Sequence, residues 1–169
     1  MKKSNVVPTL KYLWTTTRHK WFVFVGGVRT KASIWRLLCH DLSKYGPSEA
    51  PHYGRQFYGD KSDPGGFARA WLHHQNHNPH HWEYWIQRTG HDKLDKSSET
   101  MSLPMPEWAV REMLADWLGA SRAYNGEWPE RLSSWKWFSD NYEKKIVPRL
   151  HPDTKSLVDD ILAEVFGRE

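Results

Sequence analysis

The sequence has almost no cysteine and no long hydrophobic run, and both absences narrow the range of protein classes. Its 169 residues include one cysteine, Cys39, so the chain cannot form an internal disulfide. The most apolar stretch, residues 21–28, is much shorter than the ~20 residues that a transmembrane helix needs, and the mean hydropathy is -0.79. The N-terminus lacks the apolar core of a secretory signal. We therefore expect a cytoplasmic protein with no membrane partner.

Charge of one sign is not concentrated anywhere along the chain. Lysine and arginine number 24 against 20 acidic residues, which gives a formal net charge of +4. The pI near 9.1 permits an anionic ligand without requiring nucleic acid, and a small phosphorylated molecule fits equally well. The 11 tryptophans leave a non-enzymatic nucleic-acid-binding protein as an alternative, because exposed aromatic rings stack on bases. This alternative is not favoured, since the tryptophans follow helical apolar stripes, as core residues do.

Signals for strands, repeats and flexible linkers are nearly absent, whereas helical patterns follow one another along the chain. A length of 169 residues is typical of one domain. We predict an all-α, single-domain helical bundle of about six or seven helices over residues 1–169. The site is expected in residues 8–125. Helices within residues 129–167, the first over residues 129–146, would complete the core or form an interface, so a homodimer is left open.

Glycine and proline set the expected helix boundaries. Two glycines, residues 26–27, would end the first helix, and a Gly-Pro pair at residues 46–47 would close a second helix over residues 34–45. An Asn-Pro pair at residues 78–79 would divide residues 67–87 into two helical pieces, because proline disfavours helical geometry in the residue before it.

The second predicted helix carries His40, Asp41 and Lys44, whose side chains can face one cleft. An isolated His-Asp pair is more often a salt-bridged pair on a solvated face. Here the helix is otherwise largely apolar, so we expect the pair to face a site or a buried partner. Lys44 either contacts a phosphate or is a plain solvent-facing lysine near a helix end, and the residues do not separate these two interpretations.

Five histidines lie within nine residues, and this crowding is the most informative feature of the sequence. Neutral imidazoles are good ligands for Zn, Fe, Mn, Co and Ni. The alternative is that these residues are surface or packing residues beside tryptophans. Because a helix turns ~100° per residue, adjacent histidines diverge unless both approach a cluster. The candidate ligands are His73, His74, His80 and His81, and His77 completes the tract.

Two further polar residues, His19 and Asp116, stand alone in apolar helical patterns. Taken singly, each is more often a buried polar residue with a satisfied hydrogen bond. Together with His40 and Asp41 they complete a series that runs His, His-Asp, histidine tract, Asp.

This ordered series resembles the HD-domain superfamily of metal-dependent phosphohydrolases, an all-helical fold whose signature is a His, an adjacent His-Asp and a later Asp. Residues 40–44 are similar to the His-Asp-x-x-Lys run of members that hold two or more metals, and residues 80–83 are similar to a His-His-x-Glu element. More narrowly, residues 35–44, 73–85 and 111–117 resemble a family of small bacterial and phage proteins of unknown function, which fixes no substrate.

The resemblance implies a metal-dependent phosphohydrolase that acts on a nucleotide or another small phosphate ester through a metal-activated water. It implies one or two divalent transition-metal ions, and imidazole-rich ligation suits Fe, Mn, Co, Ni or Zn. Asp41 and Lys44 would be catalytic, and Lys44 would also contact the substrate phosphate. Some members carry a di-iron centre, so an oxygenase is the alternative enzyme class. The implied ligands are His19, His40, Asp41 and Asp116 for a first ion, and His73, His74, His80 and His81 with a bridging Asp41 for a second.

Overall fold

The structure is a computed structural model that describes residues 6–88 and 100–167. It confirms the all-α prediction, because these residues contain seven α-helices and one pair of three-residue strands. The strands β1 (Ile86–Arg88) and β2 (Thr100–Ser102) pair antiparallel, with Ile86 opposite Ser102. The helices are α1 (Val6–Arg29), α2 (Ile34–Cys39), α3 (Ala50–Tyr58), α4 (Pro64–His77), α5 (Glu107–Ala120), α6 (Lys136–Asn141) and α7 (Pro152–Phe166).

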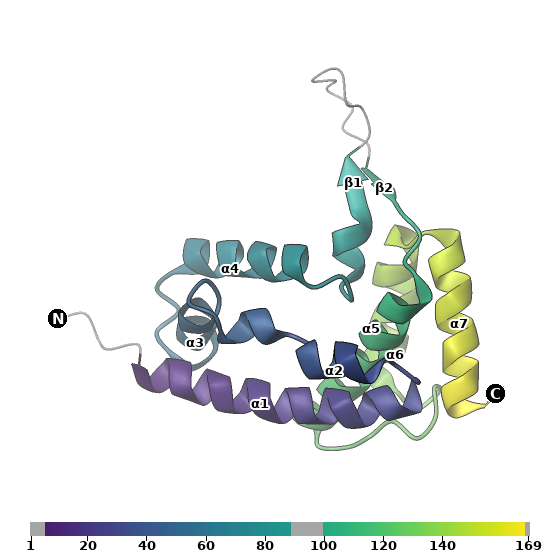
Figure 1. Cartoon of the computed structure of the whole chain (residues 1–169), viewed down its shortest axis with the longest axis horizontal. Helices are drawn as coiled ribbons and strands as arrows, with labels where there is room; N and C mark the ends of the chain where they lie inside the picture. The colour runs from purple at the N-terminus through teal and green to yellow at the C-terminus, as the bar shows by residue number, and fades with distance from the viewer. Residues whose placement is uncertain (1–5, 89–99, 168–169) are drawn as a thin grey trace.

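The long helix α1 is the base on which the other helices near the site are arranged (Figure 1). It approaches α3 and α5 closely, and a glycine stands at each crossing. A Cβ on Gly119 of α5 would lie 2.6 Å from the Val23 nitrogen of α1, and one on Gly54 of α3 would lie 2.7 Å from the Thr9 Cα. Since a larger residue would clash with backbone, these glycines set the separation of the helices that carry the site.

Two predicted boundaries and one predicted helical piece differ in the structure. The first helix does not end at residues 26–27, because both glycines are buried in α1, where a Cβ on Gly27 would lie 2.4 Å from the Leu37 side chain. The second helix is not continuous over residues 34–45: α2 ends at Cys39, Asp41 adopts a left-handed backbone with φ 55°, and a 3₁₀ turn, η1 (Leu42–Tyr45), follows. The histidine tract does break at Asn78, but the piece after it is the 3₁₀ turn η2 (Trp82–Trp85) and β1.

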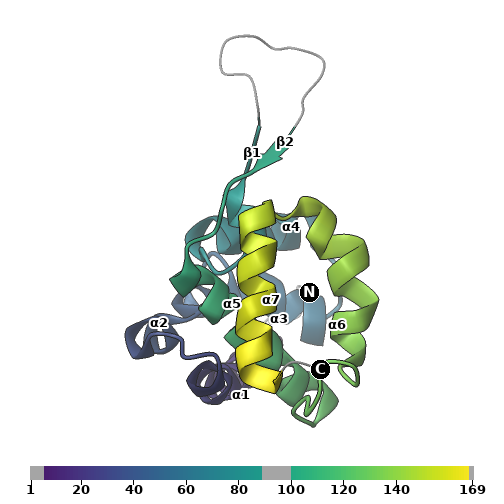
Figure 2. The same ribbon diagram turned by 90° about the vertical axis from the view of Figure 1, so that its right-hand side faces the viewer.

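The C-terminal helices complete the core. A buried cluster joins α5 to α6 and α7, and Figure 2 shows α7 crossing in front of α5. The prediction of one helix over residues 129–146 is wrong, because α6 begins only at Lys136. The ring of Trp135 is buried and donates a hydrogen bond from Nε1 to Ser121 Oγ at 2.8 Å, which fixes the chain in a non-helical conformation just before α6.

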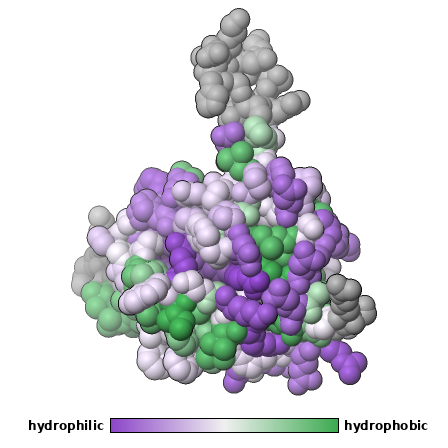
Figure 3. Space-filling view, turned by 45° about the vertical axis from the view of Figure 1, so that its right-hand side comes forward, coloured by the Kyte–Doolittle hydropathy of each residue, from purple (hydrophilic) through white to green (hydrophobic). Residues whose placement is uncertain are grey.

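The tryptophans are not uniformly core residues, contrary to expectation. Trp135 is 3% exposed, whereas Trp14, Trp21 and Trp35 on α1 and α2 are 67%, 63% and 77% exposed. Figure 3 shows hydrophobic residues gathered in the lower part of one face, at the height where Figure 1 places these two helices. The burial argument against a nucleic-acid-binding protein therefore loses part of its support. Among the described residues, no helix combines the length and apolarity needed to cross a membrane.

Candidate metal centre

Seven of the eight residues implied as metal ligands converge in the interior between α1, α4 and α5. His19 comes from α1, Asp116 from α5 and His74 from α4. The others lie on two turns: His40 and Asp41 between α2 and η1, and His80 and His81 between α4 and η2. The turns matter because adjacent side chains on a regular helix would diverge by ~100°, whereas the irregular backbone of these turns lets the neighbouring side chains approach a common volume.

The first ligand group consists of His19, His40, Asp41 and Asp116, with ligand atoms within 4.8 Å of one another. His19 Nε2 lies 2.8 Å from Asp116 Oδ1, and His40 Nε2 lies 3.5 Å from the same oxygen. His40 Nε2 also lies 3.3 Å from Asp41 Oδ2. Two ligand atoms at about 2.1 Å from one ion are about 3 Å apart, so these separations are those of ligands around a shared cation.

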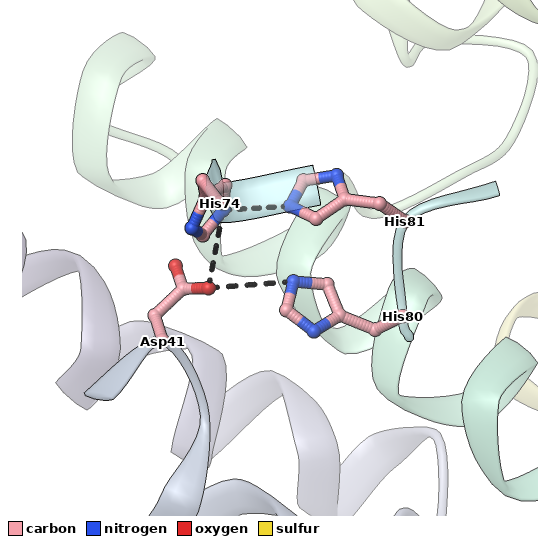
Figure 4. A group of neighbouring side chains, drawn as sticks. All are labelled: Asp41, His74, His80 and His81. Carbon is pink, nitrogen blue, oxygen red and sulfur yellow. Dashed lines mark hydrogen bonds and ion pairs between the residues drawn. The ribbon is translucent and has the colours of Figure 1, made fainter. Parts of the chain in front are cut away.

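The second ligand group consists of Asp41, His74, His80 and His81 (Figure 4). Asp41 Oδ1 lies 3.5 Å from His74 Nε2 and 3.4 Å from His80 Nε2. The two Nε2 atoms of His74 and His81 are 2.8 Å apart. Three imidazoles and a carboxylate thus direct their ligand atoms into one small volume.

Asp41 is common to both groups, and each of its oxygens faces one of them. Oδ2 faces His40, and Oδ1 faces His74 and His80. The left-handed backbone at Asp41, which aspartate tolerates better than most residues, turns the chain between α2 and η1. Lys20 on α1 supports this turn by donating from Nζ to the carbonyl oxygens of Leu38 and His40 at 2.6 and 2.9 Å. Asp41 is thus the one residue shared by the two candidate ligand groups, with one carboxylate oxygen toward each.

Several of the converging atoms have no hydrogen-bond partner among the described residues. They are His40 Nε2, Asp41 Oδ1, His80 Nε2 and Asp116 Oδ1, all buried. A buried polar atom without a partner is costly unless something else satisfies it. Because these four atoms point into the two ligand groups, the residues present fit divalent transition-metal ions with mixed nitrogen and oxygen ligation.

Glu112 on α5 contacts the Nδ1 atoms of two imidazoles whose Nε2 atoms face the ligand groups. Its Oε1 lies 3.1 Å from His40 Nδ1 and 3.3 Å from His80 Nδ1, and Arg36 Nε donates to its Oε2 at 2.8 Å. A carboxylate on the outer imidazole nitrogen fixes the tautomer and directs the other nitrogen toward a metal. We therefore interpret the third cluster of candidate ligands, His40, His80 and Glu112, as this orienting arrangement and not as a further ion site.

Glu49 plays the equivalent role for the histidines of α4. Its Oε2 lies 3.1 Å from His74 Nδ1, and its Oε1 lies 2.8 Å from His73 Nδ1. His73 is thereby held on the outer side of Glu49 and belongs to neither ligand group. The prediction that His73 is a ligand is thus not supported by its position, because adjacent residues on α4 point to different sides.

The electrostatics favour cations at the centre. Burial opposes ionisation of Asp41 and Asp116, but the neighbouring histidines, and Lys44 at Asp41, hold the pKa of both carboxyls well below the usual range. Burial likewise opposes charge on Glu112, yet hydrogen bonds from His40 and His80 lower the pKa of Glu112 to about 2. Three ionised carboxylates therefore lie in one buried volume.

The histidines respond to this field in two ways. Burial would lower the pKa of His40, but the charge of Asp41, the nearby Asp116 carboxylate and the hydrogen bond to Glu112 raise it well above its ordinary value. Burial lowers the pKa of His74 and, with His80 as a neighbour, that of His81, so both imidazoles keep a free lone pair at neutral pH.

Lys44 donates from Nζ to Asp41 Oδ2 at 2.6 Å, and this ion pair outweighs burial and raises the pKa of Lys44.

Sequence reasoning missed both glutamates. Glu112 precedes Asp116 by four residues in the same apolar helix, which is the signal that singled out Asp116, so it could have been found. Glu49 lies between Pro47 and the start of α3, in a stretch without periodicity, and no pattern in the sequence marks it.

Comparison with known proteins adds a family but no activity. A family described as "Family of unknown function (DUF5662)" matches residues 9–164, which include both ligand groups. No curated protein and no solved structure matches the chain.

Proposed function

Because the chain belongs to the DUF5662 family, whose function is unknown, we propose from the site alone that it is a metal-dependent phosphohydrolase. The enzyme would hold two divalent transition-metal ions, one in each ligand group. Its substrate would be a nucleotide or another small phosphate ester. The proposal also draws on the resemblance of His19, His40, Asp41 and Asp116 to the signature of the HD-domain superfamily.

One observation supports the proposal above all: the two oxygens of Asp41 face different ligand groups. A carboxylate that bridges two ions is the usual way to keep them close enough to act on one phosphoryl group. When bound, such ions lower the pKa of a coordinated water and neutralise charge on phosphoryl oxygens.

The residues of this chain have separate tasks in that scheme. Asp41 would hold both ions, while Glu112 and Glu49 would keep His40, His80 and His74 in orientation. Lys44 places a partly buried ammonium beside Asp41, where it can attract the phosphate of a substrate.

Metal analysis of the untagged protein tests the site. Two ions per chain are expected in the wild type, one in each ligand group. Asp41→Asn should lose both, because its carboxylate serves both groups, whereas Asp116→Asn should lose only the first ion and His81→Ala only the second. Asp140→Asn, which changes an exposed aspartate of α6, is the matched control and should keep both. A wild-type protein that takes up no Mn, Fe, Co, Ni or Zn would refute the proposal.

The activity assay follows phosphate release and oxygen consumption in parallel. Phosphate release that disappears in Asp41→Asn supports the hydrolase. Oxygen consumption with bound iron and no phosphate release identifies the oxygenase instead, since the two classes share these ligand types. Metal-independent binding of nucleic acid that weakens steeply with salt would favour the binding protein.

A further inference from the structure

A cavity of about 390 Å³ opens directly beside the second ligand group. His80, His81 and Asp116 form part of its wall, so a molecule in the cavity reaches both ligand groups. The size lies within the range of small-molecule sites. The described part of the chain thus provides a place for the remainder of a substrate whose reacting group is at the metal centre.

The rest of the cavity wall is mostly aromatic and aliphatic. It comes from α5, from the π-helical turn η3 (Ser121–Asn125) that extends it, and from η2 and the α6 region. Aromatic walls of this kind bury flat rings by stacking and by edge contacts. The apolar side chains that matter here are Trp82, Trp117, Trp137, Tyr124, Met113 and Ile146.

The charges on the wall are negative. Among the described lining residues none is lysine or arginine, whereas Glu83 and Asp116 both contribute carboxyl groups. Arg149 stacks on the Trp82 ring at 5.9 Å and donates to the Lys145 carbonyl, but it is not part of the lining. Away from the ions that Asp116, His80 and His81 would hold, a second or third phosphate in this cavity would therefore meet the Glu83 carboxyl group and no cationic side chain.

We infer that the cavity takes the uncharged, aromatic remainder of a phosphate monoester and rejects di- and triphosphates. This inference rests on the proposed hydrolase function and narrows its substrate class. Glu83 Oε2 is buried without a hydrogen-bond partner among the described residues, so it can accept a hydrogen bond from a hydroxyl or amine on the aromatic group.

Binding of non-hydrolysable probes tests the cavity without turnover. We expect benzylphosphonate to bind the metal-loaded protein about tenfold more tightly than methylphosphonate, measured by isothermal titration calorimetry. Trp137→Leu should remove most of this preference and leave methylphosphonate binding unchanged, while Trp137→Phe keeps it. Trp14→Leu changes an exposed tryptophan of α1 outside the cavity and should have no effect. Equal affinity for the two phosphonates, or equal weakening of both in Trp137→Leu, would overturn the inference.

Rates of phosphate release distinguish a failure of this inference from a failure of the proposed hydrolase function. Benzyl phosphate should release phosphate faster than glycerol phosphate, and AMP faster than ATP, each by about tenfold or more. Release at equal rates from all four esters, or faster release from ATP, overturns the inference and leaves the hydrolase standing. Preferential binding of benzylphosphonate without phosphate release from any ester supports the cavity assignment and overturns the hydrolase.

Discussion

The molecule has two interiors of opposite chemistry, and α5 contributes to both. Glu112 and Asp116, four residues apart, face the histidines and carboxylates of the candidate metal centre. Leu114 and Leu118, also four residues apart, face the aromatic core with α6 and α7. The apolar interior is stabilised mainly by burial of apolar surface, whereas the polar interior concentrates buried charge that needs counter-ions. The difference predicts which changes alter metal binding and which alter only stability.

The largest expected effect is that of metal itself on thermal unfolding. At a free metal concentration of about 1,000 times Kd, each bound ion should stabilise the folded state by about 4 kcal/mol. Chelation should lower the Tm of the wild type, and Asp41→Asn should show no response to chelator or added metal. An identical Tm for chelated and metal-loaded wild type would show that the polar interior needs no metal ion for its stability.

Leu118→Ala is the corresponding test of the apolar interior. Leu118 is fully buried in the core cluster, so its truncation should lower the free energy of unfolding by about 3 kcal/mol. The metal content of the folded fraction should not change. Leu72→Ala, at a leucine of α4 that is 57% exposed, is the control, and its effect should stay within about 0.5 kcal/mol. Loss of metal in Leu118→Ala would show that the two interiors are coupled.

Much of the apolar interior can be predicted from the sequence, and less of the polar one. The start of α7 at Pro152 can be read from the sequence, because proline suits the first turn of a helix. The path of residues 40–45 does not follow from periodicity, because a left-handed Asp41 is fixed by the cluster around it. The ligand types were readable, since His19, His40, Asp41 and Asp116 are polar residues in apolar stretches. The exclusion of His73 required the position of Glu49, which only tertiary packing determines.

Glu112→Gln examines the polar interior without removing a ligand. The substitution keeps the shape of the side chain but weakens its hold on His40 and His80, so metal affinity should fall by about 10- to 100-fold. Glu107→Gln, on the same helix but paired at the surface with Arg111, should leave affinity unchanged. Competition with a metal-binding dye gives the two affinities. Equal affinities in Glu112→Gln and the wild type would contradict the orienting role of this residue.

Two adjacent histidines give a finer comparison within α4. His74→Ala should lose the ion of the second ligand group, whereas His73→Ala should retain the full metal content and lose only its contact with Glu49. Metal analysis of both variants is sufficient. Loss of an ion in His73→Ala would restore His73 as a ligand and would require α4 to turn relative to Glu49.

The smallest effect on stability is expected at the surface ion pairs that Glu164 makes with Arg111 and Lys31. Glu164 on α7 accepts hydrogen bonds from Arg111 on α5 and from Lys31 after α1, and these bonds lower the pKa of Glu164. A lowered pKa in the folded state stabilises the protein above the unfolded value and loses this contribution as the pH falls through the folded pKa. Glu164→Gln should therefore lower the Tm slightly at neutral pH, and the difference from wild type should vanish once the pH has fallen through the lowered pKa of Glu164. Metal content should be unchanged at neutral pH, because these pairs reach neither interior. A Tm difference that persisted in acid would assign the effect to packing of the side chain and not to its charge.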